Sequence, residues 1–222
     1  MDDSVKIALV LGYAYVLGSI NASYLVGRLV KGIDLRRVGS GNVGASNIWY
    51  HVGKYWIFPI GVFDTFMKGM SPVLVSRAMD LDVSVQALAA LLAVVGHNWS
   101  LFLGFKGGRG VAPMVGTLFA LGRLELAAFI ILATAGWQLN RSSAVWVLIG
   151  YVLLPVFALW FDRPTPVVLF MLGLALVTIA KRLASNSLEN PMGVPLPNLM
   201  LNRLVFDRDI RDNEEWVNRS SA

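Results

Sequence analysis

The stretch SAVWVLIGYVLLPVFALWF, residues 143–161, contains no charged side chain. A helix needs about 20 mostly apolar residues to cross the hydrocarbon core of a bilayer, and this stretch approaches that length. A second apolar stretch, residues 164–182, follows almost at once. The two stretches predict a pair of transmembrane helices, joined by a short loop that carries Asp162 and Arg163.

Apolar segments of similar length extend over most of the chain. The protein has 222 residues, of which 56% are hydrophobic and 15% charged. This composition is too apolar for an ordinary soluble domain. We therefore predict an all-α integral membrane protein, with its membrane domain at residues 1–184 and about seven transmembrane helices. The predicted spans are 5–29, 55–78, 83–104, 110–122, 124–140, 143–161 and 164–182.

The charges in the loops predict the orientation of these spans. Cytoplasmic loops carry an excess of Lys and Arg, and an N-out, C-in arrangement places most of the loop cations inside. The net charge of +5 then reflects topology, and we predict no nucleic-acid partner. The cations placed inside are Lys31, Arg36, Arg37, Lys54, Lys106, Arg109, Arg141, Lys181 and Arg182, whereas Asp2, Asp3, Asp80 and Asp82 lie outside.

A first glycine-rich loop, GSGNVGASN at residues 39–47, falls on the predicted cytoplasmic side. Its small residues permit close backbone approach, and its hydroxyl and amide groups donate hydrogen bonds. Successive backbone N–H groups in such a loop can bind an anion. A flexible connector or a seam of small residues between helices is the alternative, and the spacing leaves both open. The candidate binding residues are Ser40, Gly41, Asn42, Gly44, Ser46 and Asn47.

A second glycine-rich loop, FKGGRGV, occupies residues 105–111. Lys106 and Arg109 bracket Gly107 and Gly108, and a helix is predicted to begin close after Gly110. Cations beside a helix N-terminus favour an anion, because the helix dipole and the free N–H groups act together. Positive-inside topology alone would also place the two cations here. The paired glycines favour the phosphate-site hypothesis.

Ionisable residues also occur inside the predicted spans. Asp64 and Lys68 are spaced i, i+4 on one helix, and such residues at membrane depth usually pair or line a polar cavity. We favour a functional Lys68 that faces the site, with a structural ion pair as the alternative. His97 lies at the end of the third span. Two histidines and no cysteine make a poor metal site, so we predict no metal and no cofactor.

Residues 185–222 change to a polar, proline-containing composition that predicts a cytoplasmic tail. The stretch 199–217 mixes apolar and charged residues, so it is a candidate amphipathic helix on the membrane or on a partner protein. A partly ordered tail is the alternative.

Three motifs in this order resemble the bacterial acyl-phosphate:glycerol-3-phosphate acyltransferase family. SGNVGASN at residues 40–47 matches that family's Ser-Gly-Asn-x-Gly-Ala-Thr-Asn, with Ser46 in place of Thr. KGMSP at residues 68–72 matches Lys-Gly-x-x-Pro. Gly96-His97, followed by FKGGRGVA at residues 105–112, matches the family's Gly-His stretch and Phe-Lys-Gly-Gly-Lys-Gly-Val-Ala. The family's seven-span, N-out architecture agrees with the orientation predicted from charge.

The resemblance implies a reaction and a location. The 1-hydroxyl of glycerol 3-phosphate would attack the carbonyl of a long-chain acyl phosphate, giving lysophosphatidate and phosphate. It also implies a multi-pass protein of the bacterial cytoplasmic membrane, with the site facing the cytoplasm and the two substrates and the lipid bilayer as partners. The implied catalytic residues are Lys68, His97, Lys106 and Arg109, and the residues implied to bind substrate phosphate are Ser40, Gly41, Asn42, Gly44, Ser46, Asn47, Gly107, Gly108 and Gly110.

The sequence departs from the family pattern at several positions. Tyr50 stands where the family has an Arg, and Thr65 where it has an Asp, although Asp64 is adjacent. The end of the last span, residues 176–183, lacks the family's His and Asn. These departures leave a rival hypothesis open, in which a homologue without catalysis serves as an accessory subunit of a membrane complex and docks through its tail. A transporter is a third, weaker alternative.

Overall fold

The computed structural model describes residues 2–186, 193–212 and 215–216, and these are helical or irregular apart from one isolated bridge between Ser100 and Lys106. The described α-helices are α1 (Asp3–Ser19), α2 (Ala22–Lys31), α3 (Ala45–His51), α4 (Ile57–Val62), α5 (Ser71–Ala78), α6 (Val83–Asn98), α7 (Val111–Leu121), α8 (Arg123–Asn140), α9 (Ser143–Trp160), α10 (Thr165–Ala184) and α11 (Leu196–Phe206). Short 3-10 turns are η1 (Leu35–Arg37), η2 (Lys54–Trp56) and η4 (Leu101–Leu103), and η3 (Phe63–Met70) is π-helical.

Among the described residues, three helical segments are long and apolar enough to cross a membrane: Asp3–Lys31, Ser143–Trp160 and Thr165–Ala184. Shorter apolar helices are Val83–Asn98 and Val111–Leu121. The prediction of an all-α chain is confirmed for the described residues, whereas the count of seven spans stays a prediction. α6 ends before the predicted boundary at residue 104, because the chain turns through η4 and a left-handed Gly104.

The first predicted span, 5–29, corresponds to the candidate span Asp3–Lys31, but a break between Ser19 and Ala22 divides it into two helices. α1 ends at Ser19, and α2 begins after Asn21. The Asn21 side-chain oxygen accepts a hydrogen bond from the N–H of Tyr24 at 2.9 Å, which caps α2. Its amide nitrogen donates to the carbonyl of Val43 at 3.2 Å. The break therefore ties the helix to the first glycine-rich loop.

The π-helical turn η3 crosses α7 at very short distance. A Cβ on Gly69 would overlap the carbonyl oxygen of Pro113, and a Cβ on Gly116 would overlap that of Thr65. Small residues let helix backbones approach in this way. The Thr65 hydroxyl also donates to the carbonyl of Ala112 at 3.2 Å. These contacts hold Asp64 and Lys68, which lie on η3, close to the start of α7.

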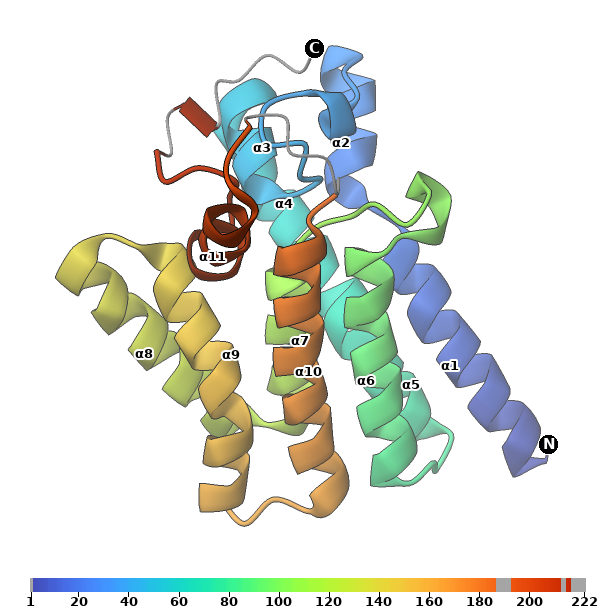
Figure 1. Cartoon of the computed structure of the whole chain (residues 1–222). Helices are drawn as coiled ribbons and strands as arrows, with labels where there is room; N and C mark the ends of the chain where they lie inside the picture. Colours follow the sequence, from blue (N-terminus) through green and yellow to red (C-terminus); the bar gives the residue numbers. More distant parts are fainter. Residues whose placement is uncertain (1, 187–192, 213–214, 217–222) are drawn as a thin grey trace.

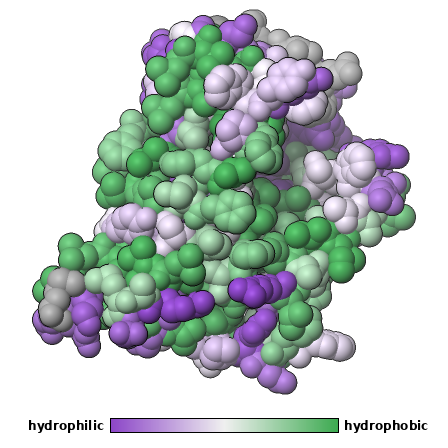
Figure 2. Space-filling model, turned by 180° about the vertical axis from the view of Figure 1, so that it is seen from behind, coloured by the Kyte–Doolittle hydropathy of each residue, from purple (hydrophilic) through white to green (hydrophobic). Residues whose placement is uncertain are grey.

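The helices lie side by side, and the longer irregular segments gather at one end of the bundle, whereas short turns join helices at the other (Figure 1). α2, α3 and α11 lie at this end, whereas the N-terminal start of α1 lies at the opposite end (Figure 1). The face in Figure 2 is apolar across its middle, and hydrophilic residues gather mainly toward its ends. Large apolar side chains such as Leu29, Phe58 and Trp160 are exposed. This surface suits a hydrocarbon solvent better than water.

The described part of the tail folds back onto the membrane domain. α11 contacts α9 and α10. The Arg182 guanidinium donates to the carbonyls of Leu204 and Ala144, both at 2.8 Å. Arg203 and Asp209 form a buried ion pair at 2.6 Å. The candidate amphipathic stretch 199–217 thus overlaps α11, which begins at Leu196 and ends at Phe206. Residues 187–192, 213–214 and 217–222 of the predicted tail lie outside the described residues.

Candidate functional site

A cavity of about 670 Å³ lies where the glycine-rich loops, the end of α10 and the tail meet. Its lining combines apolar residues, which include Ile57, Ile60 and Val115, with polar residues. The polar residues include Ser40, Asn42, Ser46, Asp64, His97, Arg109, Arg141, Ser142, Ser143, Thr178, Lys181, Arg182, Asp207 and Arg208.

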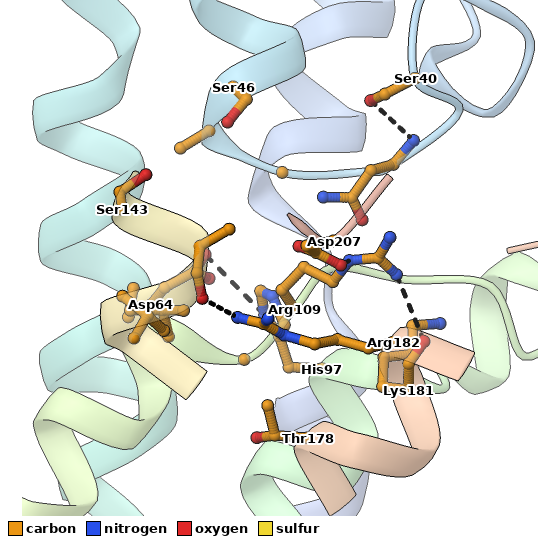
Figure 3. Close-up of a pocket in the computed structure, with 18 of the residues that line it drawn as sticks. Ser40, Ser46, Asp64, His97, Arg109, Ser143, Thr178, Lys181, Arg182 and Asp207 are labelled. Atoms are coloured by element: carbon orange, nitrogen blue, oxygen red, sulfur yellow. Dashed lines mark hydrogen bonds and ion pairs between the residues drawn. The ribbon is translucent and has the colours of Figure 1, made fainter. Parts of the chain in front are cut away.

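Positive charge dominates the cavity. Five of the described lining residues are Arg or Lys, and two are Asp. Arg109 and Lys181 are in contact, because the Arg109 Nη1 group donates to the Lys181 carbonyl at 3.4 Å (Figure 3). Asp207 lies beside Arg109, with 2.7 Å between Oδ1 and Nε (Figure 3). An excess of cations in a partly apolar pocket favours an anionic, amphiphilic ligand.

The first glycine-rich loop is held in a fixed shape by its own polar groups. Gly41 has a φ of +68°, a conformation that side chains disfavour. The N–H of Asn42 donates to the Ser40 hydroxyl at 3.3 Å. The buried Asn47 amide donates to the carbonyls of Leu35 and Val38 at 3.1 and 2.8 Å. Asn47 thereby closes the loop behind the cavity.

The second loop packs against the end of α6. The N–H of Gly108 donates to the carbonyl of His97 at 3.1 Å, and a Cβ on Gly108 would overlap the imidazole of His97. Gly110 has a φ of +74° and precedes the first residue of α7. The predicted helix start after Gly110 is therefore confirmed. The close packing explains why both glycines are needed at these positions.

Asp64, Lys68 and His97 form one buried group beneath the loops. The Lys68 Nζ atom lies 3.0 Å from Asp64 Oδ1 and 2.9 Å from His97 Nδ1. His97 Nδ1 is 3.9 Å from Asp64 Oδ2. Lys68 is fully buried, whereas Asp64 and His97 line the cavity. Lys68 therefore influences the cavity through its contacts with Asp64 and His97.

The structure brings about half of the predicted site residues to the cavity wall. Ser40, Asn42, Gly44, Ser46, His97, Arg109 and Gly110 line the cavity. Of the others, Gly41, Asn47, Gly107 and Gly108 shape the loops from behind, and Lys68 supports Asp64 and His97. Lys106 is exposed to solvent and lies outside the lining. Tyr50, where the family has Arg, is 55% exposed and also lies outside it.

Sequence reasoning missed several polar residues of the cavity lining, among them Lys181, Arg182 and Asp207. Lys181 and Arg182 were counted only as topology-setting cations, and Asp207 was placed in the tail. Lys181 is 1% exposed, and its ammonium lies 5.3 Å from the centre of the Trp99 ring. The sequence feature that could have identified Lys181 and Arg182 is a Lys-Arg pair at the end of an apolar helix. No local pattern indicates that Asp207 meets Arg109, since the contact joins segments distant in sequence.

Outside the spans, Arg36 is occupied by a neighbouring acid. Its Nη2 and Nε groups lie 2.7 and 3.0 Å from the Asp34 carboxylate, and its backbone N–H donates to the same group at 3.0 Å. The hydrogen bonds from Arg36 lower the pKa of Asp34 to about 2. Arg36, upstream of the first loop, is thus partly neutralised before any ligand binds.

Several known proteins that are similar to the chain are named glycerol-3-phosphate acyltransferases. The family model for glycerol-3-phosphate acyltransferase matches residues 8–188. The relative "Glycerol-3-phosphate acyltransferase 5" of Dehalococcoides mccartyi is 37% identical over 215 residues, which cover 94% of this chain and 91% of the relative. "Glycerol-3-phosphate acyltransferase 2" of Moorella thermoacetica is 42% identical over 163 residues, covering 73% of this chain and 82% of the relative.

Two solved structures of PlsY (YgiH), an integral membrane glycerol 3-phosphate acyltransferase, are similar to the fold. Its glycerol 3-phosphate form matches with a TM-score of 0.73 and 29% identity, covering 79% of this chain and 88% of that one. Its lysophosphatidic acid form matches with a TM-score of 0.74 and 25% identity, covering 95% and 97%. The chain therefore belongs to the glycerol-3-phosphate acyltransferase family of membrane enzymes.

Proposed function

We propose that the protein transfers a long-chain acyl group from acyl phosphate to the 1-hydroxyl of glycerol 3-phosphate, giving lysophosphatidate and inorganic phosphate. The observation that carries the proposal is the cavity itself, in which Arg109 and Lys181 lie beside the two glycine-rich loops. Both substrates carry phosphate, and one carries a long apolar chain. A cationic cavity that also has apolar lining residues matches these two chemistries.

The proposed reaction needs no nucleophile from the protein. The substrate hydroxyl oxygen forms an ester bond with the acyl carbon, the bond from that carbon to the phosphate oxygen breaks, and the hydroxyl proton leaves with the phosphate. Arg109, Lys181 and the backbone N–H groups of the loops would neutralise the phosphates and align the hydroxyl. Positioning and electrostatic stabilisation together can supply most of the acceleration.

The proposed orientation places the cavity on the cytoplasmic side of the cell membrane. The loops lie at the end of the bundle opposite the start of α1 (Figure 1), which supports an N-out arrangement with the site inside. We propose that the helical segments make seven crossings, with α4, η3 and α5 forming one of them. A partner for the tail stays a prediction. The hypothesis of an accessory subunit is not favoured, because relatives of this similarity are named as acyltransferases.

The test uses purified full-length protein in detergent with labelled glycerol 3-phosphate. Palmitoyl phosphate, palmitoyl coenzyme A and palmitoyl acyl carrier protein are supplied in separate reactions, and lysophosphatidate is measured. We expect product from palmitoyl phosphate alone. Product from one of the other donors only would overturn the proposed donor, and no product from any donor would overturn the proposed reaction. The variant Arg123→Met removes an exposed cation that lies outside the cavity lining, and we expect it to form lysophosphatidate as the wild type does.

A further inference from the structure

Asn186, just beyond the end of α10, uses its side-chain amide for four hydrogen bonds. Nδ2 donates to the carbonyls of Gly41 and Gly107 at 3.0 and 2.9 Å. Oδ1 accepts from the N–H of Gly107 at 3.1 Å and from Nζ of Lys181 at 2.7 Å. A carboxamide has two donor hydrogens and an oxygen with two lone pairs. The hydrogen-bonding capacity of Asn186 is therefore fully used.

These bonds join the two glycine-rich loops to each other and to α10. A direct bond between the loops runs from the Val43 N–H to the Gly107 carbonyl, and it is long, at 3.4 Å. The bonds made by Asn186 are shorter and reach both loops from one side chain. Gly41 lies between two cavity-lining residues, Ser40 and Asn42. A shift of Gly41 would therefore move two groups of the cavity wall.

The third connection of Asn186 reaches the cations of the cavity. Its oxygen holds the Lys181 ammonium, and the Lys181 carbonyl accepts from Arg109. Figure 3 shows Lys181 and Arg109 side by side at the cavity. One amide thus fixes both loops and one of the cavity's buried cations. Asn186 stands outside the family motifs, and it lies beyond the stretch 176–183 that lacks the family's Asn.

We propose that Asn186 is a positioning residue of the acyl-transfer site, which holds the two loops and Lys181 in the geometry that binds substrate phosphate. The proposal rests on the proposed function, since it assigns the residue a role in that reaction. An amide is required because it both donates and accepts. Aspartate at this position would place a carboxylate oxygen against the carbonyl oxygens of Gly41 and Gly107. Alanine would leave Gly41, Gly107 and Lys181 without their hydrogen bonds to this side chain.

The test compares Asn186→Asp and Asn186→Ala with the wild-type enzyme in detergent. Apparent KM for glycerol 3-phosphate, kcat and the midpoint of thermal unfolding are measured for each protein. We expect both variants to raise KM at least about 10-fold, since displaced loops bind phosphate less well. The unfolding midpoint should stay within a few degrees of wild type, because Asn186 is partly exposed at a chain segment beyond the last span.

The control is Gln86→Ala. Gln86 also donates from a side-chain amide to a backbone carbonyl, that of Leu81 at 2.9 Å, but it lies near the start of α6, away from the loops. The KM of the Gln86→Ala enzyme for glycerol 3-phosphate should equal that of the wild type. A merely structural role for Asn186 would lower the unfolding midpoint and the amount of active enzyme while leaving KM unchanged, and that result would overturn the proposal.

Binding of glycerol 3-phosphate, measured by calorimetry without an acyl donor, separates this proposal from the proposed function. A wild-type protein that neither binds glycerol 3-phosphate nor forms product would overturn both. A wild-type protein that binds and turns over, with Asn186→Asp and Asn186→Ala matching it in affinity and KM, would overturn the role of Asn186 alone. We expect the wild type to bind and both variants to bind at least about 10-fold more weakly.

Discussion

Gly108 lies directly against His97, so closely that a Cβ on Gly108 would overlap the Nε2 atom of the imidazole. The same glycine donates its N–H to the His97 carbonyl. Gly108→Ala must therefore displace either the second loop or the histidine that lines the cavity. We expect kcat/KM for glycerol 3-phosphate to fall at least about 100-fold, the scale seen when a preorganised donor is lost.

The matched glycine for this experiment is Gly12 on α1, where a Cβ would meet no atom within 4 Å. Gly12→Ala should leave kcat/KM unchanged. Equal activity of Gly108→Ala and Gly12→Ala would mean that the second loop is only a connector.

Because Asp64 and Lys68 form a buried ion pair, we expect single and double variants to differ in their free energy of unfolding. Lys68→Met leaves the Asp64 carboxylate buried without its cation. Breaking a buried pair in this way lowers the free energy of unfolding by about 3–5 kcal/mol. The double variant Lys68→Met/Asp64→Asn removes both charges, and we expect it to recover most of the unfolding free energy. It should stay inactive, because Asp64 lines the cavity and Lys68 contacts His97.

Unfolding in denaturant and turnover of the same preparations check this expectation. A double variant with wild-type kcat would show that the pair only stabilises the helix, which is the alternative considered from the sequence.

Asp207 occupies the Arg109 guanidinium that a substrate phosphate would also use. Asp207→Asn removes this competing charge, so we expect the KM for glycerol 3-phosphate to fall roughly 3- to 10-fold. Steady-state kinetics at fixed acyl phosphate measure the change. The control is Asp212→Asn, an exposed carboxylate in the same segment. A KM that is unchanged or higher in Asp207→Asn would contradict competition for Arg109.

The lowered pKa of Asp34 predicts how stability depends on pH. Its folded-state pKa is about 2, below the usual 3.8, so ionised Asp34 stabilises the folded protein. That contribution is complete above about pH 5 and is lost as the pH falls from about 4 to about 2. The difference in unfolding free energy between wild type and Asp34→Asn should shrink over the same range.

Denaturant unfolding in detergent at a series of pH values measures this difference. Arg36→Met removes the principal hydrogen-bond donor to Asp34, and it should abolish most of the same pH dependence. A difference that is constant down to about pH 2 would contradict the assignment.

Much of the helical architecture could be predicted from local patterns. Apolar runs predicted α9 and α10 within a few residues, because a helix depends on neighbours three and four positions apart. The i, i+4 spacing placed Asp64 next to Lys68 for the same reason. The break at Asn21 was missed, since it depends on a bond from Asn21 to Val43, which belongs to another segment.

The site itself was predicted only in part. The glycines and Arg109 were recognisable from motif spacing, but the exposure of Lys106 was not. The chain turns through left-handed backbone at Gly104 and Phe105 immediately before it, and these angles direct the lysine toward solvent. A motif fixes the order of side chains, whereas the backbone angles around it decide which of them face the cavity.

The sequence by itself determined that the chain is helical and that its helices are apolar, and it predicted that two glycine-rich loops form a phosphate site. Only the tertiary structure decided that Asn186 joins those loops and that Asp207 meets Arg109. Asn186 and Gly41 are 145 positions apart. Helix formation is set by short-range periodicity, but contacts at such separation exist only after the helices have packed, so no local pattern encodes them.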